Sequence, residues 1–278
     1  GCEDFKLIFS YICFKSYFNG EFQFSEARLR SYIQSARQKF DRYTFGVEEF
    51  QEDLTQSVCM LVKEGMIYHF SHRSFQEYFA AWYTCKLVDD VQSKLLLNWI
   101  KESDSVFSDS YFQMLFDLQS EKVNKIIICP MLKEVKKLYI QYGYSLELLD
   151  TLFEGIRFNK RGKDGIYNTS LIIKDKYLCY GLMLNNKLNK FPYGNSNNDE
   201  QVVYDKVKEY FSKGSRENDI NHRQFSFNEI LNILTKEELL KHLQWFQSQV
   251  EFAMQIVEKY DDTNINRKKK VATILEEL

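Results

Sequence analysis

The histidines and cysteines are the residues of this chain best suited to acid–base, nucleophilic or metal chemistry. None of the four histidines lies in a nucleophile motif such as Gly-x-Ser-x-Gly; they are His69, His72, His222 and His242. The six cysteines are far apart, and no Cys-x-x-Cys pair or Cys/His cluster has metal-ligand spacing. We therefore predict no catalytic residue and no metal site, and we expect buried cytosolic thiols and surface positions for His222 and His242.

Nucleotide hydrolysis would require a loop of the form Gly-x-x-x-x-Gly-Lys-Ser/Thr, whose backbone cradles the phosphates. The nearest approach runs from Gly155 to Asp164, but it has six residues between its two glycines. It also ends in an aspartate where a magnesium-binding hydroxyl is needed. These residues are therefore predicted not to hydrolyse ATP by themselves, and we expect no cofactor bound to them alone.

The charge balance excludes a global field that would recruit nucleic acid or an anionic membrane. There are 37 Lys and Arg residues against 39 Asp and Glu residues, a formal net charge of -2. Two basic groups, Arg267 to Lys270 and the looser Arg157 to Lys163, could contact phosphate, although such runs are usually solvated surface. The most apolar stretch, Leu7–Phe14, is far shorter than the roughly 20 residues of a membrane span. We expect a cytoplasmic protein with no membrane partner.

The elements that position these residues are expected to be mainly α-helical. Only two prolines occur, whereas 23 phenylalanines and 18 tyrosines can serve as core anchors. Apolar spacing predicts helices at 4–18, about 25–40, 50–65 and 72–88, with Ser25 as the N-cap of the second. Residues 66–70 are short and β-prone. Three helices, a short strand and another helix predict a winged-helix domain.

The second part of the chain is expected to be a mostly helical domain with a small β-hairpin. Short paired helices are predicted from 89 to about 155, and residues 167–173 and 177–183 are predicted to pair as the hairpin. Residues 190–199 are rich in turn residues and predict a loop. Helices are expected at 202–211, 227–234 and 236–259, the last with one continuous apolar stripe.

The most specific segment runs from Tyr68 to Trp82 and contains His72, Phe75, Gln76 and Glu77. It resembles the Phe-x-His-x-Ser-Phe-Gln-Glu-Phe/Tyr-Phe-Ala-Ala signature that closes the winged-helix domain of NACHT proteins, within the STAND class of NTPases. The preceding Leu61-Val-Lys-Glu-Gly-Met-Ile segment also looks like that family's lead-in to its wing. The resemblance covers about residues 4–88 and lapses beyond residue 90.

The resemblance implies a role for each motif residue. His72 would correspond to the histidine that donates to the β-phosphate of bound ADP and holds the switch closed. Phe70 and Phe75 would pack the wing against its helix, and Glu77 and Phe79 would complete the motif's packing. An imidazole N–H can donate to a phosphate oxygen, and one such bond is worth roughly 1.5–3 kcal/mol, enough to bias a switch.

The resemblance also implies the organisation and partners of the protein. Residues 1–88 would be the winged-helix domain, and residues 89–278 a C-terminal sensor or interaction domain of a bacterial NLR-like protein. We expect an upstream NACHT domain that binds ADP or ATP with magnesium, a phage or host protein as trigger, oligomerisation on activation, and a role in antiviral defence. The opening Gly1-Cys2, without a methionine, leads us to expect a piece of a longer protein.

Two alternatives belong to other functional classes. A winged-helix DNA-binding protein with a helical dimerisation tail would use the basic residues at helix 25–40, namely Arg28, Arg30, Arg37, Lys39 and Arg42. Acidic residues dilute that set, so nucleic acid is the less favoured partner. A plain scaffold would dock a partner helix on the stripe of helix 236–259, which requires that stripe to be exposed.

Overall fold

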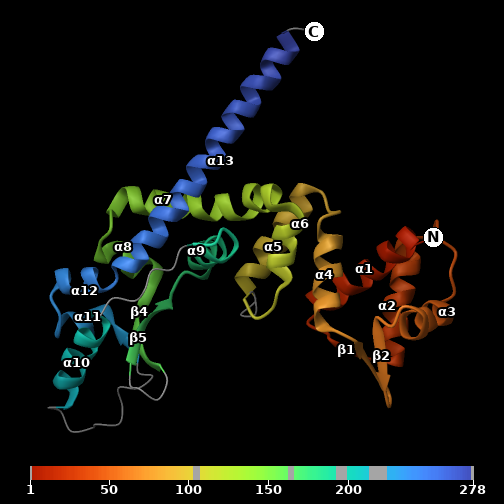
Figure 1. Ribbon diagram of the computed structural model, residues 1–278, viewed down its shortest axis with the longest axis horizontal. Coiled ribbons are helices and arrows are strands. Elements are labelled where there is room, and N and C mark those ends of the chain that lie inside the picture. Colours follow the sequence, from red (N-terminus) through yellow and green to blue (C-terminus); the bar gives the residue numbers. More distant parts are fainter. Residues whose placement is uncertain (1, 103–106, 162–165, 192–198, 213–223, 277–278) are drawn as a thin grey trace. The chain divides into compact units, whose positions relative to one another are not determined.

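The computed structural model describes residues 2–102, 107–161, 166–191, 199–212 and 224–276 (Figure 1). It is mostly helical with two small antiparallel sheets, as the composition predicts. The chain forms two compact units, Gly1–Asn124 and Lys125–Leu278. The functional boundary expected after residue 88 stays a prediction. Within the described ranges, no helix combines the length and apolarity needed to cross a membrane.

The first unit places a three-stranded sheet among helices. Its sheet has the order β1-β3-β2, and all its pairings are antiparallel. Its elements are α1 (Cys2–Phe18), β1 (Gln23–Ser25), α2 (Glu26–Lys39), α3 (Val47–Glu52), a π-helical turn (Asp53–Ser57), β2 (Leu61–Glu64), β3 (Ile67–Phe70), α4 (Arg73–Thr84), α5 (Asp89–Glu102) and α6 (Tyr111–Val123).

The local signals at the ends of the first helices are confirmed. Gly20, after the end of α1, has φ of 69°, which glycine adopts without steric cost. The hydroxyl of Ser25 accepts the backbone N–H of Arg28 and caps α2. Buried Phe9, Phe24 and Phe70 then bring α1, β1 and β3 together in one aromatic core.

The helix predicted over residues 50–65 is wrong in its second half. The α-helix ends at Glu52 and widens into the π-helical turn, after which residues 61–64 form β2. Phe50 and Leu54 are buried as expected, but Val58 is 41% exposed. The three- to four-residue spacing of apolar residues that predicted the helix continues by chance into β2. There Leu61 is buried and lies opposite Phe70 in the sheet.

The second unit holds a three-stranded sheet of order β5-β4-β6. A π-helical turn (Asn124–Ile128) leads into it. Its elements are α7 (Cys129–Tyr142), α8 (Leu146–Leu152), β4 (Phe153–Arg161), β5 (Ile166–Ile173), α9 (Lys176–Leu188), α10 (Asp199–Ser212), β6 (Gln224–Ser226), α11 (Phe227–Leu231), α12 (Lys236–His242) and α13 (Gln244–Glu276).

The predicted strand at 167–173 is confirmed as β5, but the partner predicted for it at 177–183 is wrong. β5 pairs with β4, whereas residues 177–183 lie in α9. Asp175 caps α9 by accepting the backbone N–H of Leu178, and this cap favours a helix directly after β5. β4 was obscured in the sequence because Arg157 separates the buried Ile156 and Phe158, and two further basic residues end the strand.

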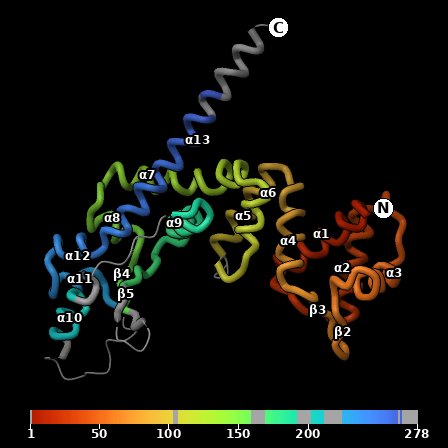
Figure 2. The backbone as a smooth tube through the Cα atoms, in the orientation of Figure 1, coloured from red at the N-terminus to blue at the C-terminus, as the bar shows by residue number. Residues whose placement is uncertain are grey.

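The long C-terminal helix is interrupted at Leu243, which separates α12 from α13. Figure 2 shows the backbone of α13 crossing that of α7, and ion pairs join the two helices: Lys133 to Asp261 at 2.7 Å and Lys136 to Glu258 at 3.0 Å. The apolar stripe is buried at Leu239, Leu243, Phe246, Val250 and Val257. The scaffold alternative therefore lacks the exposed stripe that it requires.

Candidate functional site

The motif that contains His72 spans β3 and the first turns of α4. His72 is the N-cap residue of α4, with extended backbone angles, and its side chain makes no capping hydrogen bond. The imidazole is exposed, and the ring of Phe75 meets it edge-on at a centroid distance of 6.1 Å. Within the described residues no hydrogen bond engages its ring nitrogens. The side chain is therefore available to a group outside this unit.

Two of the motif's aromatic residues pack against other rings of the unit, and a third is partly exposed. Phe70 is buried against Phe24, and Phe79 lies edge-on to Phe9 at 5.0 Å. Phe75, in contrast, is 37% exposed. The buried face of α4 contains Gln76 and Ala80. Phe75 precedes Gln76 by one position, so its side chain is turned about 100° away from that face. The packing role that the resemblance implies for Phe75 stays a prediction.

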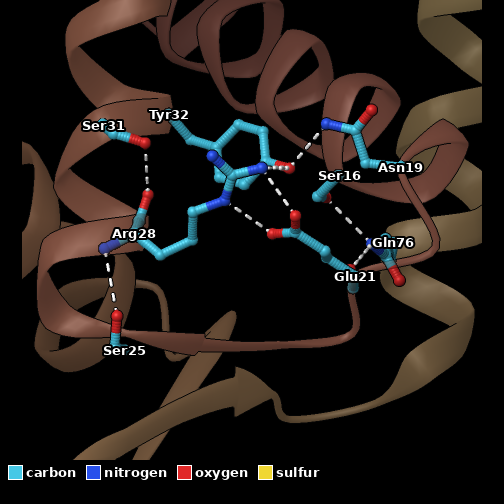
Figure 3. A network of polar contacts seen from close by, with 8 residues as sticks. All are labelled: Ser16, Asn19, Glu21, Ser25, Arg28, Ser31, Tyr32 and Gln76. Carbon is cyan, nitrogen blue, oxygen red and sulfur yellow. Dashed lines mark hydrogen bonds and ion pairs between the residues drawn. The ribbon is translucent and has the colours of Figure 1, made fainter.

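Gln76 is a site residue that the sequence analysis missed. Its side chain is fully buried, and its Nε2 donates to Ser16 Oγ at 2.9 Å and to the Glu21 carbonyl at 2.8 Å (Figure 3). It thereby fastens α4 to the end of α1 and to the turn that follows. The burial of Gln76 could have been predicted from its position, because Gln76, Ala80 and Tyr83 recur at the spacing of one helix face.

Glu77 lies at the centre of a second polar group, which we call the carboxylate cluster: Tyr17, Arg73, Glu77 and Asp109. Glu77 is 5% exposed; its Oε1 pairs with Arg73 Nε at 3.1 Å, and its Oε2 accepts the backbone N–H of Ser110. Asp109 accepts the hydroxyl of Tyr17 at 2.9 Å and lies 3.8 Å from Arg73 Nη2. Burial, and then the charge of Asp109, raise the pKa of Tyr17. Through the hydrogen bond between Glu77 and Ser110, the motif is thus connected to the start of α6.

Two of the four basic residues of α2, Arg28 and Arg30, are engaged within the unit, whereas Arg37 and Lys39 are exposed. Arg28 forms a bidentate pair with Glu21, at 2.8 and 2.6 Å, and lies over the ring of Tyr32 (Figure 3). Arg30 pairs with Glu26 and Glu48, each at 2.9 Å. Hydrogen bonds from Arg28 hold the pKa of Glu21 below its ordinary value. Binding of Arg28 and Arg30 to DNA phosphates would have to break these pairs, which weighs against a DNA-binding role for those two residues.

Among the remaining histidines, the prediction made for His242 does not match the structure. His242 is 7% exposed, and its Nε2 lies 2.6 Å from Thr169 Oγ1, so the surface position predicted for it is wrong. It faces β5 because α12 packs its last turn inward. His69 lies 3.4 Å from Glu64, and His222 falls outside the described residues. Among the described residues, no group of three His, Cys, Asp or Glu could hold a metal ion.

The cysteines differ in burial, and the two basic groups lie in β4 and α13 where they are described. Cys13, Cys129 and Cys179 are buried as predicted, whereas Cys2 and Cys59 are exposed. Burial raises the pKa of Cys129 to about 11. The group at Arg157 to Lys163 belongs in part to β4 and in part lies outside the described residues. Residues 267–270 continue the backbone of α13.

Comparison with known families identifies the second part of the chain. No curated protein and no solved structure gives a match. Residues 116–278, more than half of the chain, match the model of the Short NACHT-associated C-Terminal domain, family 7 (SNaCT7). The match begins within α6 and covers the whole second unit. The chain therefore belongs to this family and is a NACHT-associated C-terminal segment.

Proposed function

We propose that this chain is the C-terminal regulatory part of a bacterial NACHT-type nucleotide switch, and that residues 1–88 form its winged-helix domain. The family match to a NACHT-associated C-terminal domain supports the first statement. The order helix, strand, helix, helix, strand, strand, with sheet order β1-β3-β2, supports the second. ATP hydrolysis then belongs to an upstream NACHT domain, which would bind ADP or ATP with magnesium.

His72 is proposed to sense the nucleotide, and its exposed position carries this proposal. The imidazole lies at the N-terminal end of α4, without a hydrogen-bond partner within the described residues. A helix N-terminus favours a phosphate because its first N–H groups and the helix dipole both attract negative charge. A β-phosphate of ADP could accept the imidazole N–H there. Exposed Phe75 and Tyr78 would give the upstream domain an apolar surface beside it.

Residues 89–278 are proposed to recognise a phage or host protein trigger, or to hold the switch inactive until one arrives. The SNaCT7 domain occupies most of this range. Trigger binding would stabilise the open state relative to the ADP-bound state and so permit oligomerisation and antiviral defence. Energetically, the trigger must bind the two states with different affinities for any shift to occur.

The test is His72→Ala in the longer protein that includes the nucleotide-binding domain. Loss of one hydrogen bond to a charged group should weaken ADP retention roughly tenfold or more and raise resting activity. His69→Ala is the matched control, because His69 lies three residues earlier with its ring against Glu64. ADP affinity that is unchanged in the His72 variant, or equally reduced in both, would remove His72 from the site.

A further inference from the structure

A cleft of about 430 Å³ lies in the first unit, beside the carboxylate cluster. The end of α1, the turn after it, the start of α4 and the end of α5 form its walls. Aromatic rings make up much of the lining: Tyr17, Phe18, Phe22 and Trp99. Its size lies within the range of sites that accept a small molecule or an inserted side chain. The proposed nucleotide switch gives this cleft no role.

The charges on the lining favour a positively charged guest. Arg73 is the one cation of the described lining, and Glu102 and Asp109 are its two carboxylates. Arg73 already forms an ion pair with the buried Glu77, and its guanidinium lies 4.1 Å from the centroid of the Phe22 ring. An anion would meet a guanidinium that is already engaged and two carboxylates that repel it. The formal charge of the lining is therefore negative, and Arg73 is not an anion site.

Glu102 is the carboxylate best placed to meet a guest. It is exposed, and no hydrogen bond or ion pair engages its side chain within the described part of the chain. Trp99 lies three residues earlier on α5, so the two side chains share one face of that helix. The indole stacks on Phe112 and meets Phe18 edge-on, and these contacts fix its orientation. A fixed aromatic wall beside a free carboxylate is an arrangement that attracts organic cations.

We propose that this cleft binds a basic side chain, arginine or lysine, of a polypeptide partner. Such a side chain has an aliphatic stem to cover the aromatic rings and a cationic end to meet Glu102, since Asp109 is already engaged by Tyr17 and Arg73. A free small amine has the charge but too little apolar surface for a wall of four rings. The proposal does not depend on nucleotide sensing by His72, so either can fail without the other.

The experiment follows the indole N–H signal of Trp99 by NMR in the 278-residue chain. The chain has three tryptophans, and Trp99→Phe assigns the signal. The probe is the peptide Gly-Gly-Arg-Gly-Gly, and its citrulline counterpart is the neutral control. We expect a saturable shift with the arginine peptide that salt weakens, and little shift with citrulline. Equal responses to both peptides, or shifts confined to Trp82 and Trp245, would overturn the proposal.

Two exposed glutamates test the charge without disturbing the core. Glu102→Gln should weaken peptide binding about two- to fivefold, the range for a solvent-exposed ion pair. Glu52→Gln, on α3 and outside the cleft lining, should leave it unchanged. Equal affinities for the Glu102 variant and the unmodified chain would remove Glu102 from the site. Methylammonium, which has the charge without the stem, should bind far more weakly than the peptide; equally tight binding would overturn the assignment to a basic side chain.

Discussion

Glu77 on α4 accepts the backbone N–H of Ser110, the N-cap residue of α6, at 3.2 Å across 33 residues of sequence. The same carboxylate pairs with Arg73, the residue next to His72. One buried side chain therefore links the end of α4 that we propose to sense nucleotide with the helix in which the SNaCT7 match begins. A displacement of α4 at His72 would strain this hydrogen bond. Glu77 is therefore a physical connection between α4 and the start of α6.

Glu77→Gln should keep an acceptor for Ser110 but lose the charge that faces Arg73. Because Glu77 is buried while Arg73 is half-exposed, we expect the free energy of unfolding to fall by only about 1–2 kcal/mol. Glu77→Ala should cost more, since it also leaves the Ser110 N–H without a partner. Urea unfolding followed by circular dichroism measures both. Equal losses for the two variants would show that the bond to Ser110 contributes nothing.

Gln76 and Gln92 are both fully buried, yet the same substitution should affect them in opposite ways. Gln76→Met removes the donor to Ser16 and Glu21 and should destabilise the protein by about 1–3 kcal/mol. Both amide atoms of Gln92 lack a hydrogen-bond partner, so Gln92→Met should be neutral or stabilising. Thermal unfolding midpoints compare the pair. Similar losses at both positions would contradict the hydrogen-bonding explanation.

Gly155 should tolerate no side chain, because it sits at the irregularity in β4 where β6 pairs. Its φ is 157°, and an added Cβ would lie 1.9 Å from the Phe225 carbonyl oxygen, far inside contact distance. We expect Gly155→Ala to destabilise the protein by about 3 kcal/mol or more, because backbone strain adds to the steric clash. Gly143→Ala is the control: φ is 64°, but the space is open, so strain alone applies. Comparable losses for the two variants, measured by urea unfolding, would rule out the clash.

The Glu21–Arg28 pair should contribute a small acid-sensitive part of the stability. Arg28 holds the pKa of Glu21 below its usual 4.5, so the folded state stabilises the charged form. This contribution is complete above pH 4.5 and is lost as the pH falls through the lower folded value. The pair is solvent-accessible, so its size should be below about 1 kcal/mol. Unfolding midpoints of Glu21→Gln should fall less on acidification than those of the unmodified chain, whereas Glu52→Gln should match it.

The position of the motif could be predicted because its signals are local. Ser25 caps α2 through the backbone three residues ahead, and His72 precedes α4 as the sequence pattern indicates. The buried stripe from Leu239 to Val257 follows from the helical period alone. The strand pairing could not be predicted in this way: β4 binds β6 across about 70 residues, and its basic residues concealed its buried face.

A mainly helical chain and the location of the NACHT-like motif follow from the residues alone. These depend on residue type and short-range spacing, which the chain carries in any conformation. The folded arrangement was needed to show that Phe75 is partly exposed, that His242 is buried, and that the four residues of the carboxylate cluster meet beside a cleft. Those contacts join residues far apart in sequence, and the packing of α1, α4 and α6 brings them within hydrogen-bonding distance.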